Sequence, residues 1–234
     1  MLHWQDWLYP ARCAGCGQPG DLICAECRRT VPRLPALACP TCQHEVPPGE
    51  GCAHCRHSPN SLDGLRAVGR YVPSQEGETR SRFTDIIHAF KYQGLHALAT
   101  PLGDWLADSL RDDPLPGTVI LPLPSHPRRI AERGYDHTAL LSQRVAHQLG
   151  LPYVDHWLYR VRYTASQAGS GLSADERRAN VSGAFVARPM PPHSHILLID
   201  DIYTTGATMA ECARTLRAAG AARVWGAVLG CVAH

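Results

Sequence analysis

The sequence has almost no lysine, since Lys91 is the only lysine among 23 basic residues. These bases face 21 acidic residues, so the formal net charge is only +2. A balance this close to neutral excludes a dominant basic field that would by itself recruit nucleic acid or an anionic membrane. It does not exclude a local basic surface.

Long apolar runs are also missing. No stretch approaches the roughly 18 apolar residues of a membrane-spanning helix, so we expect no membrane insertion. The first ten residues, MLHWQDWLYP, lack the basic start and apolar run of a secretory signal, and we expect a cytoplasmic protein. With 44% hydrophobic and 19% charged residues, the chain has enough apolar side chains for a core, which excludes wholesale disorder.

Cysteine is abundant and clustered: eight of the 10 cysteines fall in four Cys-x-x-Cys pairs near the N-terminus. A disulfide scaffold would need an oxidising compartment, which the missing secretory signal argues against. The pairs therefore predict thiolate metal sites, with zinc as the usual metal and an iron–sulfur cluster as the alternative.

Two such pairs complete one tetrahedral site, so four pairs predict two structural zinc ions. Sequential pairing gives one site of Cys13, Cys16, Cys24 and Cys27 and another of Cys39, Cys42, Cys52 and Cys55. An interleaved pairing is the alternative, as is replacement of a thiolate by His44, His54 or His57. With all ligand positions filled, catalysis at either zinc is not expected.

Beyond this module, residues 1–58, the chain alternates strands and helices over residues 59–234. Apolar spacing predicts helices around residues 83–90, 100–110, 135–149 and 207–219, and a capping box opens another helix at Ser173. Apolar runs predict strands at 65–72, 119–123, 153–158, 184–187, 196–200 and 223–232. The alternation predicts an α/β fold with a mostly parallel sheet and helices on both faces.

One strand–loop–helix segment, residues 196–208, carries a phosphate-binding pattern. An apolar strand ends in Asp200 and Asp201, and a loop of small residues leads into a helix. Backbone N–H groups at a helix N-terminus favour a phosphate dianion, and Gly206 allows the backbone a close approach. The hydroxyls of the loop threonines add donors, while the two acids are placed to accept from sugar hydroxyls, directly or through Mg²⁺.

This segment resembles the motif of type I phosphoribosyltransferases that binds 5-phosphoribosyl 1-pyrophosphate (PRPP). The whole chain resembles the ComF family, through the double zinc ribbon and several further motifs. These are Phe90-Lys-Tyr-Gln-Gly94, Leu121-Pro-Leu-Pro124, Arg133-Gly-Tyr-Asp-His137, Arg162-Tyr-Thr-Ala-Ser-Gln167 and Arg177-Arg-Ala-Asn-Val-Ser-Gly-Ala-Phe185. The family usually reads Arg-Gly-Phe-Asn-Gln at residues 133–137, so Asp136 and His137 here replace amides with titratable groups.

The resemblance implies a type I phosphoribosyltransferase-like domain and roles for particular residues. Asp200 and Asp201 are the catalytic acids that serve ribose and metal. The phosphates of PRPP are held by Tyr203, Thr204, Thr205, Gly206, Ala207 and Thr208, with Arg133 and Lys91. For Lys91, a purely structural role at the helix C-terminus is the alternative. A flexible loop carrying Arg162, Thr164 and Gln167 is expected to close over the substrate.

The family further implies a role in DNA uptake and natural transformation. The protein would bind PRPP with Mg²⁺ and handle incoming single-stranded DNA with helicase and recombination partners. Arginines 128, 129, 133, 160, 162, 177 and 178 would track phosphates, and Tyr135, Tyr159 and Tyr163 would stack on bases; generic solvated arginine is the alternative. No residue marks the acceptor or an obvious general base, and His137 is one weak candidate for that base. Two other functions stay open: an active phosphoribosyltransferase with no DNA role, and a zinc-mediated docking module on an inactive transferase.

Overall fold

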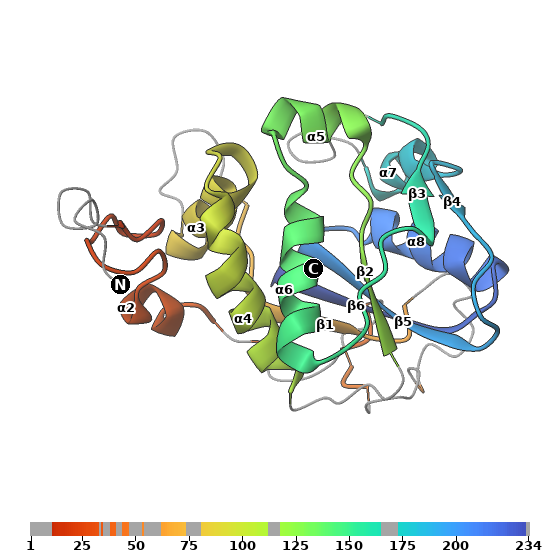
Figure 1. The fold of residues 1–234 in the computed structure, drawn as a ribbon, viewed down its shortest axis with the longest axis horizontal. Coiled ribbons are helices and arrows are strands. Elements are labelled where there is room, and N and C mark those ends of the chain that lie inside the picture. The colour runs from red at the N-terminus through yellow and green to blue at the C-terminus, as the bar shows by residue number, and fades with distance from the viewer. Residues whose placement is uncertain are drawn as a thin grey trace.

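The computed structural model describes residues 11–32, 34, 38–40, 44–46, 53, 62–73, 81–111, 118–164 and 173–232. Its centre is a four-stranded sheet in the order β1-β6-β5-β2 (Figure 1). The strands are β1 (Leu65–Arg70), β2 (Thr118–Pro122), β5 (Ser194–Tyr203) and β6 (Ala221–Cys231). Every pairing within this sheet is parallel, which confirms the predicted fold class.

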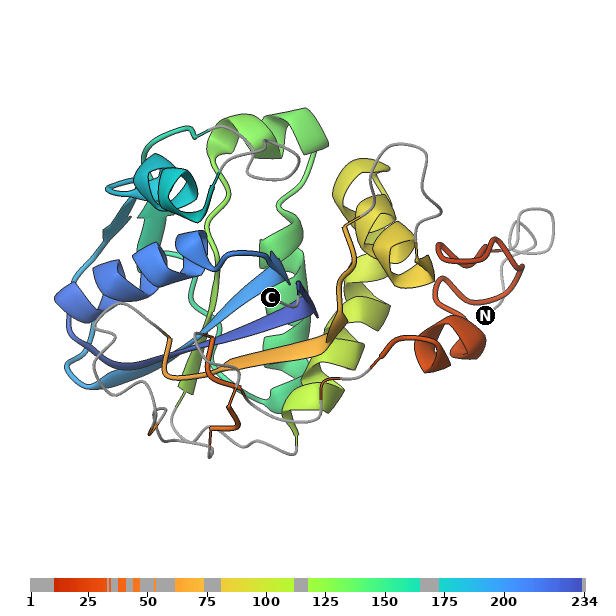
Figure 2. The ribbon, with the colours of Figure 1, turned by 180° about the vertical axis from the view of Figure 1, so that it is seen from behind.

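Helices cover both faces of the sheet (Figures 1 and 2). On one face lie α4 (Ala99–Leu110) and α6 (His137–Leu149), with α3 (Arg82–Tyr92) beside α4; on the other lies α8 (Ala207–Ala218). Along β5, Leu197 and Ile199 join the first core and Ile196 and Leu198 join the second. A strand buried on both faces reads as one unbroken apolar run, which is why β5 could be predicted from the sequence.

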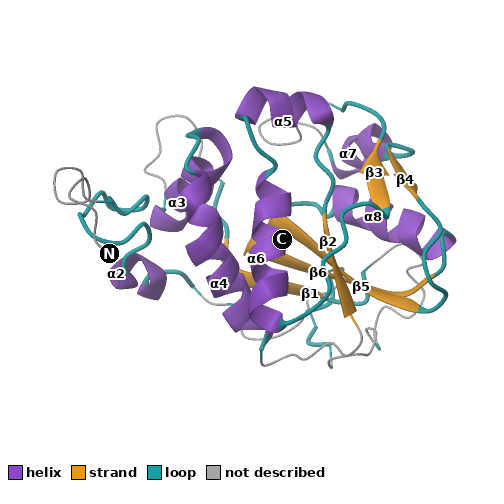
Figure 3. Cartoon of the chain, in the orientation of Figure 1, coloured by secondary structure: helices purple, strands orange, loops and turns teal. Residues whose placement is uncertain are grey.

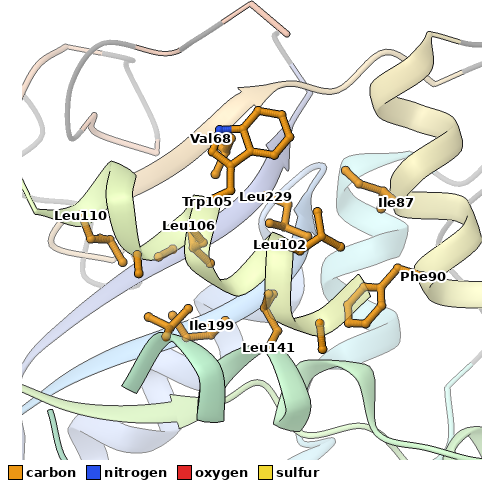
Figure 4. Packing of buried hydrophobic residues seen from close by; sticks show 14 of the residues in the cluster. Val68, Ile87, Phe90, Leu102, Trp105, Leu106, Leu110, Leu141, Ile199 and Leu229 are labelled. Atoms are coloured by element: carbon orange, nitrogen blue, oxygen red, sulfur yellow. The ribbon is translucent and has the colours of Figure 1, made fainter. Parts of the chain in front are cut away.

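The core under α4 and α6 is closely packed (Figure 4). Phe90 from α3, Leu102 and Leu106 from α4, and Leu141 from α6 are each 0% exposed. Phe83 meets the ring of Trp105 edge-on, with ring centroids 5.6 Å apart. This packing fixes the C-terminal end of α3 against the start of α6, and both helix ends contribute to the functional site.

A smaller antiparallel sheet stands apart from the central one. It consists of β3 (Leu158–Arg160) and β4 (Phe185–Ala187), and with α7 (Ala174–Val181) it forms the unit that we call the hood. The strand predicted at 153–158 was wrong for all but its last residue. Tyr153 makes only an isolated bridge with Ile120, and the strand begins at Leu158, where β4 supplies a partner.

Helix boundaries follow the local sequence signals. The predicted capping box is present, because the Ser173 and Glu176 side chains each accept from the other's backbone N–H. A short helix that the sequence did not predict, α5 (Pro127–Arg133), follows β2 and ends at Gly134, where φ is 82°. The helix predicted from residue 100 begins at Ala99, because the 3-10 turn η1 (His96–Leu98) runs directly into α4.

The N-terminal segment packs on this α/β unit rather than standing alone. Its helix, α2 (Ala25–Arg29), lies beside α3 in Figure 3, and Cys13 and Cys27 belong to the same buried core as α3 and α4. Arg28 donates a 3.0 Å hydrogen bond to the carbonyl of Pro101. The predicted domain boundary near residue 58 lies outside the described residues and stays a prediction. None of the described helices has the length and apolar character that a membrane span requires.

Candidate functional site

Four cysteines converge near the N-terminus. The sulfur atoms of Cys13, Cys16, Cys24 and Cys27 all lie within 4.8 Å of one another. Backbone N–H groups donate to two of them, from Cys24 to the Cys13 sulfur and from Cys27 to the Cys24 sulfur, each at 3.4 Å. This set consists of the first two Cys-x-x-Cys pairs, as in sequential pairing. Of the four cysteines predicted for the second zinc site, Cys39 is buried, and Cys42, Cys52 and Cys55 lie outside the described residues.

The first cysteine cluster suits a structural zinc ion. Burial by itself raises the pKa of the Cys13 thiol, but N–H groups of Cys24 and neighbouring residues outweigh it and lower that pKa to about 6, whereas burial and the neighbouring cysteines raise the pKa of Cys27. A thiolate is the form that binds metal. Four sulfurs within reach of one point give the closed tetrahedral set of a structural site, with no position left for substrate.

The loop between β5 and α8 leaves several hydrogen-bond donors without a partner among the described residues. It contains Thr204, Thr205 and Gly206, and α8 begins at Ala207 with no side-chain cap on its N-terminal N–H groups. The hydroxyl oxygen of Thr205 is buried and has no hydrogen-bond partner within the described part of the chain. Unsatisfied donors of this kind are costly unless a ligand meets them, and a phosphate does so at a helix N-terminus.

Gly206 has a strict conformational role in this loop. Its φ is 72°, in the left-handed region that favours glycine. A Cβ at this position would lie 1.9 Å from the hydroxyl oxygen of Tyr203, so the buried tyrosine fills the space of a side chain. Tyr203 therefore shapes the loop from beneath, a role that the sequence pattern did not indicate.

Two adjacent carboxylates at the end of β5 have different environments. Asp201 is almost fully buried, and its Oδ2 lies 2.9 Å from Lys91 Nζ and 2.8 Å from His137 Nε2. Asp200 is half-buried and accepts a 2.8 Å hydrogen bond at Oδ1 from the backbone N–H of Asp201. Three elements, α3, α6 and β5, therefore meet at Asp201.

The electrostatics separate the two acids. Burial opposes ionisation of Asp201, but the charge of Lys91 and the contact with His137 prevail and hold its pKa far below the usual range. Burial and the charge of Asp201 raise the pKa of Asp200. Asp201 therefore already has its counter-charges, whereas Asp200 is the acid that gains most from a new cation or hydroxyl partner.

Lys91 and Arg133, both predicted to bind phosphate, are placed around Asp201. Lys91 pairs with it directly, and burial, which lowers the pKa of Lys91, is outweighed by the charge of Asp201. An Arg133 nitrogen lies 2.8 Å from His137 Nδ1, one step behind Asp201. The buried ion pair was missed from the sequence, although the single lysine inside a family motif was a usable signal.

The predicted flexible loop is described as far as Thr164, so Gln167 lies outside the described residues. Arg162 donates to the backbone carbonyls of Asn180 and Ser182, at 3.0 and 2.6 Å. Thr164 is buried and accepts hydrogen bonds from Arg129 and Arg160. This loop start is thus fastened to the hood and to α5.

The two acids and His137 form a candidate metal site. His137, Asp200 and Asp201 place ligand atoms within 4.8 Å of one another. Magnesium prefers oxygen ligands and keeps several waters, so an imidazole and a carboxylate already paired with lysine are poor ligands. Asp200 fits, because a bound cation would offset the cost of burying its charged carboxylate, the cost that raises its pKa.

A parallel sheet with an uncapped loop–helix start and an acid pair at the end of a central strand is the arrangement of a phosphoribosyltransferase-type fold, here preceded by a zinc ribbon. Comparisons with known proteins agree: residues 4–56 match the double zinc ribbon domain. Competence protein F of Haemophilus influenzae is 30% identical over 216 residues, which cover 87% of this chain and 89% of that protein. The DNA utilization protein YhgH of Salmonella typhi is 31% identical, with coverage of 92% and 94%. The chain therefore belongs to the ComF family.

Among solved structures, similarity extends to phosphoribosyltransferases. An allosteric regulatory enzyme of purine biosynthesis aligns with a TM-score of 0.41 and 20% identity, covering 61% of this chain and 30% of that one. The hypoxanthine-guanine phosphoribosyltransferase of Leishmania donovani gives 0.33 and 20%, with coverage of 57% and 69%.

Proposed function

We propose that the chain binds PRPP together with Mg²⁺ at the β5–α8 loop, and that it handles incoming single-stranded DNA in the cytoplasm during DNA uptake. The observation that carries PRPP binding is the uncapped start of α8 beside the buried, unpartnered hydroxyl of Thr205. That loop would hold the 5-phosphate through backbone N–H groups and the hydroxyls of Thr204, Thr205 and Thr208.

The two acids would then have different roles. Asp200 would accept hydrogen bonds from the ribose hydroxyls and would be the carboxylate that holds a bound cation. Asp201, held by Lys91 and His137, would fix the end of β5 so that Asp200 keeps its position. Mg²⁺, when bound with PRPP, would supply charge neutralisation of the diphosphate.

A pyrophosphate-release assay tests catalysis at this site. Protein, PRPP and Mg²⁺ are incubated with and without nucleobases and single-stranded DNA, with Asp200→Asn as the inactive comparison. Release that depends on an added base would support transferase activity. No release under any condition, together with measurable PRPP binding, would support a PRPP-binding role without catalysis.

DNA handling is supported by an arginine–tyrosine surface, made of Arg128 and Arg133 from α5 with Tyr92 from α3 and Tyr163 from the loop after β3. Arg128 stands 4.9 Å from the centre of the Tyr163 ring, and Arg133 stands 5.3 Å from that of Tyr92. The two rings are 40% and 53% exposed. Exposed rings beside cations suit stacking bases and the phosphates of a flexible single strand.

Other residues predicted to stack on bases have different surroundings. The Tyr135 hydroxyl donates to the carbonyl of Phe90, and Tyr159 lies under Arg188 in the hood. Tyr163→Ala is therefore the informative variant and Tyr159→Ala its matched control. We expect Tyr163→Ala to weaken binding of a single-stranded oligonucleotide by roughly 1–3 kcal/mol, and the control to leave it nearly unchanged. Binding insensitive to salt, or equal losses in both variants, would contradict this surface. Helicase and recombination proteins remain the partners that the family resemblance implies.

An active transferase without a DNA role is the second candidate. The observation that favours it is the hood, which packs on α8 and stands beside the loop that would hold PRPP. A hood over the acceptor position would exclude water during group transfer, and a protein that only senses the ligand does not require this.

A further inference from the structure

Two arginines from different elements meet at one buried threonine beside the hood. Arg129 of α5 donates a 3.1 Å hydrogen bond to the backbone carbonyl of Thr164. Arg160 of β3 donates to the hydroxyl of the same residue. Thr164 is only 3% exposed, so it holds the two guanidinium groups near each other at the edge of the site.

This arginine pair has no salt-bridge partner. Within the described part of the chain, neither Arg129 nor Arg160 forms an ion pair with a carboxylate, and the Nε of Arg160 is buried without a hydrogen-bond partner. Burial, followed by the charge of Arg129, lowers the pKa of Arg160. Two neighbouring cations with a buried, unused donor are unfavourable unless an anion joins them.

Arg160 is held against the hood sheet. Its guanidinium lies 5.4 Å from the centre of the Phe185 ring on β4. Burial lowers the pKa of Arg160, and the charge of Asp200 acts in the opposite direction. Arg160 is therefore a hood residue whose charge interacts with the acid assigned to the ribose hydroxyls.

We propose that Arg129 and Arg160 bind an anionic group of the acceptor substrate, a carboxylate or phosphate carried on a planar ring that enters beneath the hood. The assignment rests on the proposed PRPP site, because the acceptor must reach the ribose that Asp200 holds. A guanidinium matches a carboxylate or phosphate with paired N–H donors, which makes charge the feature that the site would select.

The test compares ligands that differ only in this charge. Orotate and uracil share a ring and differ by one carboxylate, and each is titrated calorimetrically into the full-length protein saturated with ribose 5-phosphate and Mg²⁺, so that no transfer occurs. We expect orotate to bind at least about tenfold more tightly than uracil, since hydrogen bonds to charged groups are the strong ones. Arg160→Gln should abolish the preference, and Arg129→Gln should reduce it.

Arg188→Gln is the matched control, because Arg188 directly follows β4 of the hood and stands 4.8 Å from the ring centre of Tyr159. It should keep the preference for orotate. Circular dichroism checks folding, and the Arg129 variant serves if Arg160→Gln does not fold. The proposal is overturned if wild type does not prefer orotate, if the preference survives both glutamine variants, or if Arg160→Gln weakens binding of inorganic pyrophosphate but not of orotate. A separate PRPP titration tests the proposed function. A preference for orotate without PRPP binding would contradict the PRPP site but would still support an anion site at the arginine pair.

Discussion

The buried contact between Lys91 and Asp201 gives the sharpest stability prediction. Their charged atoms lie 2.9 Å apart, with side-chain exposures of 16% and 3%. Asp201→Asn keeps the size of the side chain but removes its charge, and it leaves Lys91 and His137 facing a neutral amide. Because neither partner can turn to solvent, the loss is that of a broken buried pair rather than of a surface contact.

Breaking a buried pair costs about 3–5 kcal/mol in the free energy of unfolding. At roughly 2–4 °C per kcal/mol for a chain of this size, the melting temperature should fall by about 6–20 °C. Lys91→Met should cost less, about 1–3 kcal/mol, because His137 Nε2 still contacts Asp201 at 2.8 Å. The double variant should lose at least about 1 kcal/mol less than the sum of the single losses.

Urea unfolding at pH 7 of wild type, both single variants and the double variant measures this coupling. Asp104→Asn is the comparison, since its partner Arg144 and Asp104 itself are each 30% exposed and should contribute only about 1 kcal/mol. If the two single losses add within about 0.5 kcal/mol, or if Asp201→Asn costs no more than Asp104→Asn, the buried network does not have the strength that its geometry implies.

Three further predictions concern the loop, the zinc and the second acid. Gly206→Ala places a Cβ against Tyr203 at a residue with positive φ, which costs about 1–3 kcal/mol in backbone strain. The PRPP affinity measured by calorimetric titration should therefore fall at least tenfold, and an unchanged affinity would show that the loop is not tight. Cys27→Ser should lower the zinc content by one ion per chain and reduce the melting temperature, because Cys27 belongs to the same core as α3. Cys212→Ser, at a buried cysteine outside the cluster, should keep all of its zinc. Equal zinc content in both variants would contradict a zinc site at the cluster. Burial and the charge of Asp201 raise the pKa of Asp200. The folded protein therefore favours the protonated form of Asp200, so the free energy of unfolding declines as pH rises above about 4, the pKa of an exposed aspartate. Asp200→Asn should therefore gain stability over wild type at pH 7 relative to pH 4 while losing PRPP binding, and a difference that does not vary with pH would refute the assignment.

The parts of the fold that could be predicted are those whose local sequence decides the structure. β5 is buried on both faces and therefore reads as an apolar run, and the loop after it carries its own glycine and hydroxyls. The capping box at Ser173 is likewise complete within four positions of the chain. In each case the signal and its structural consequence lie in the same short segment.

What could not be predicted depends on tertiary contacts. α5 has seven residues and no apolar stripe, so only Pro127 and Gly134 marked its ends. β4 was predicted at 184–187, but β3 has only three residues and exists because it pairs with β4. The partners of Asp201 come from α3 and α6, and no spacing within either helix points to β5.

Binding of the 5-phosphate of PRPP by the β5–α8 loop can be measured by calorimetric titration of PRPP with Mg²⁺. Thr205→Val removes the buried, unpartnered hydroxyl of the loop, and Thr118→Val removes another such hydroxyl at the start of β2. We predict that wild type and Thr118→Val bind PRPP alike and that Thr205→Val binds about tenfold more weakly or worse. No binding to wild type, or equal affinity in the two valine variants, would contradict it.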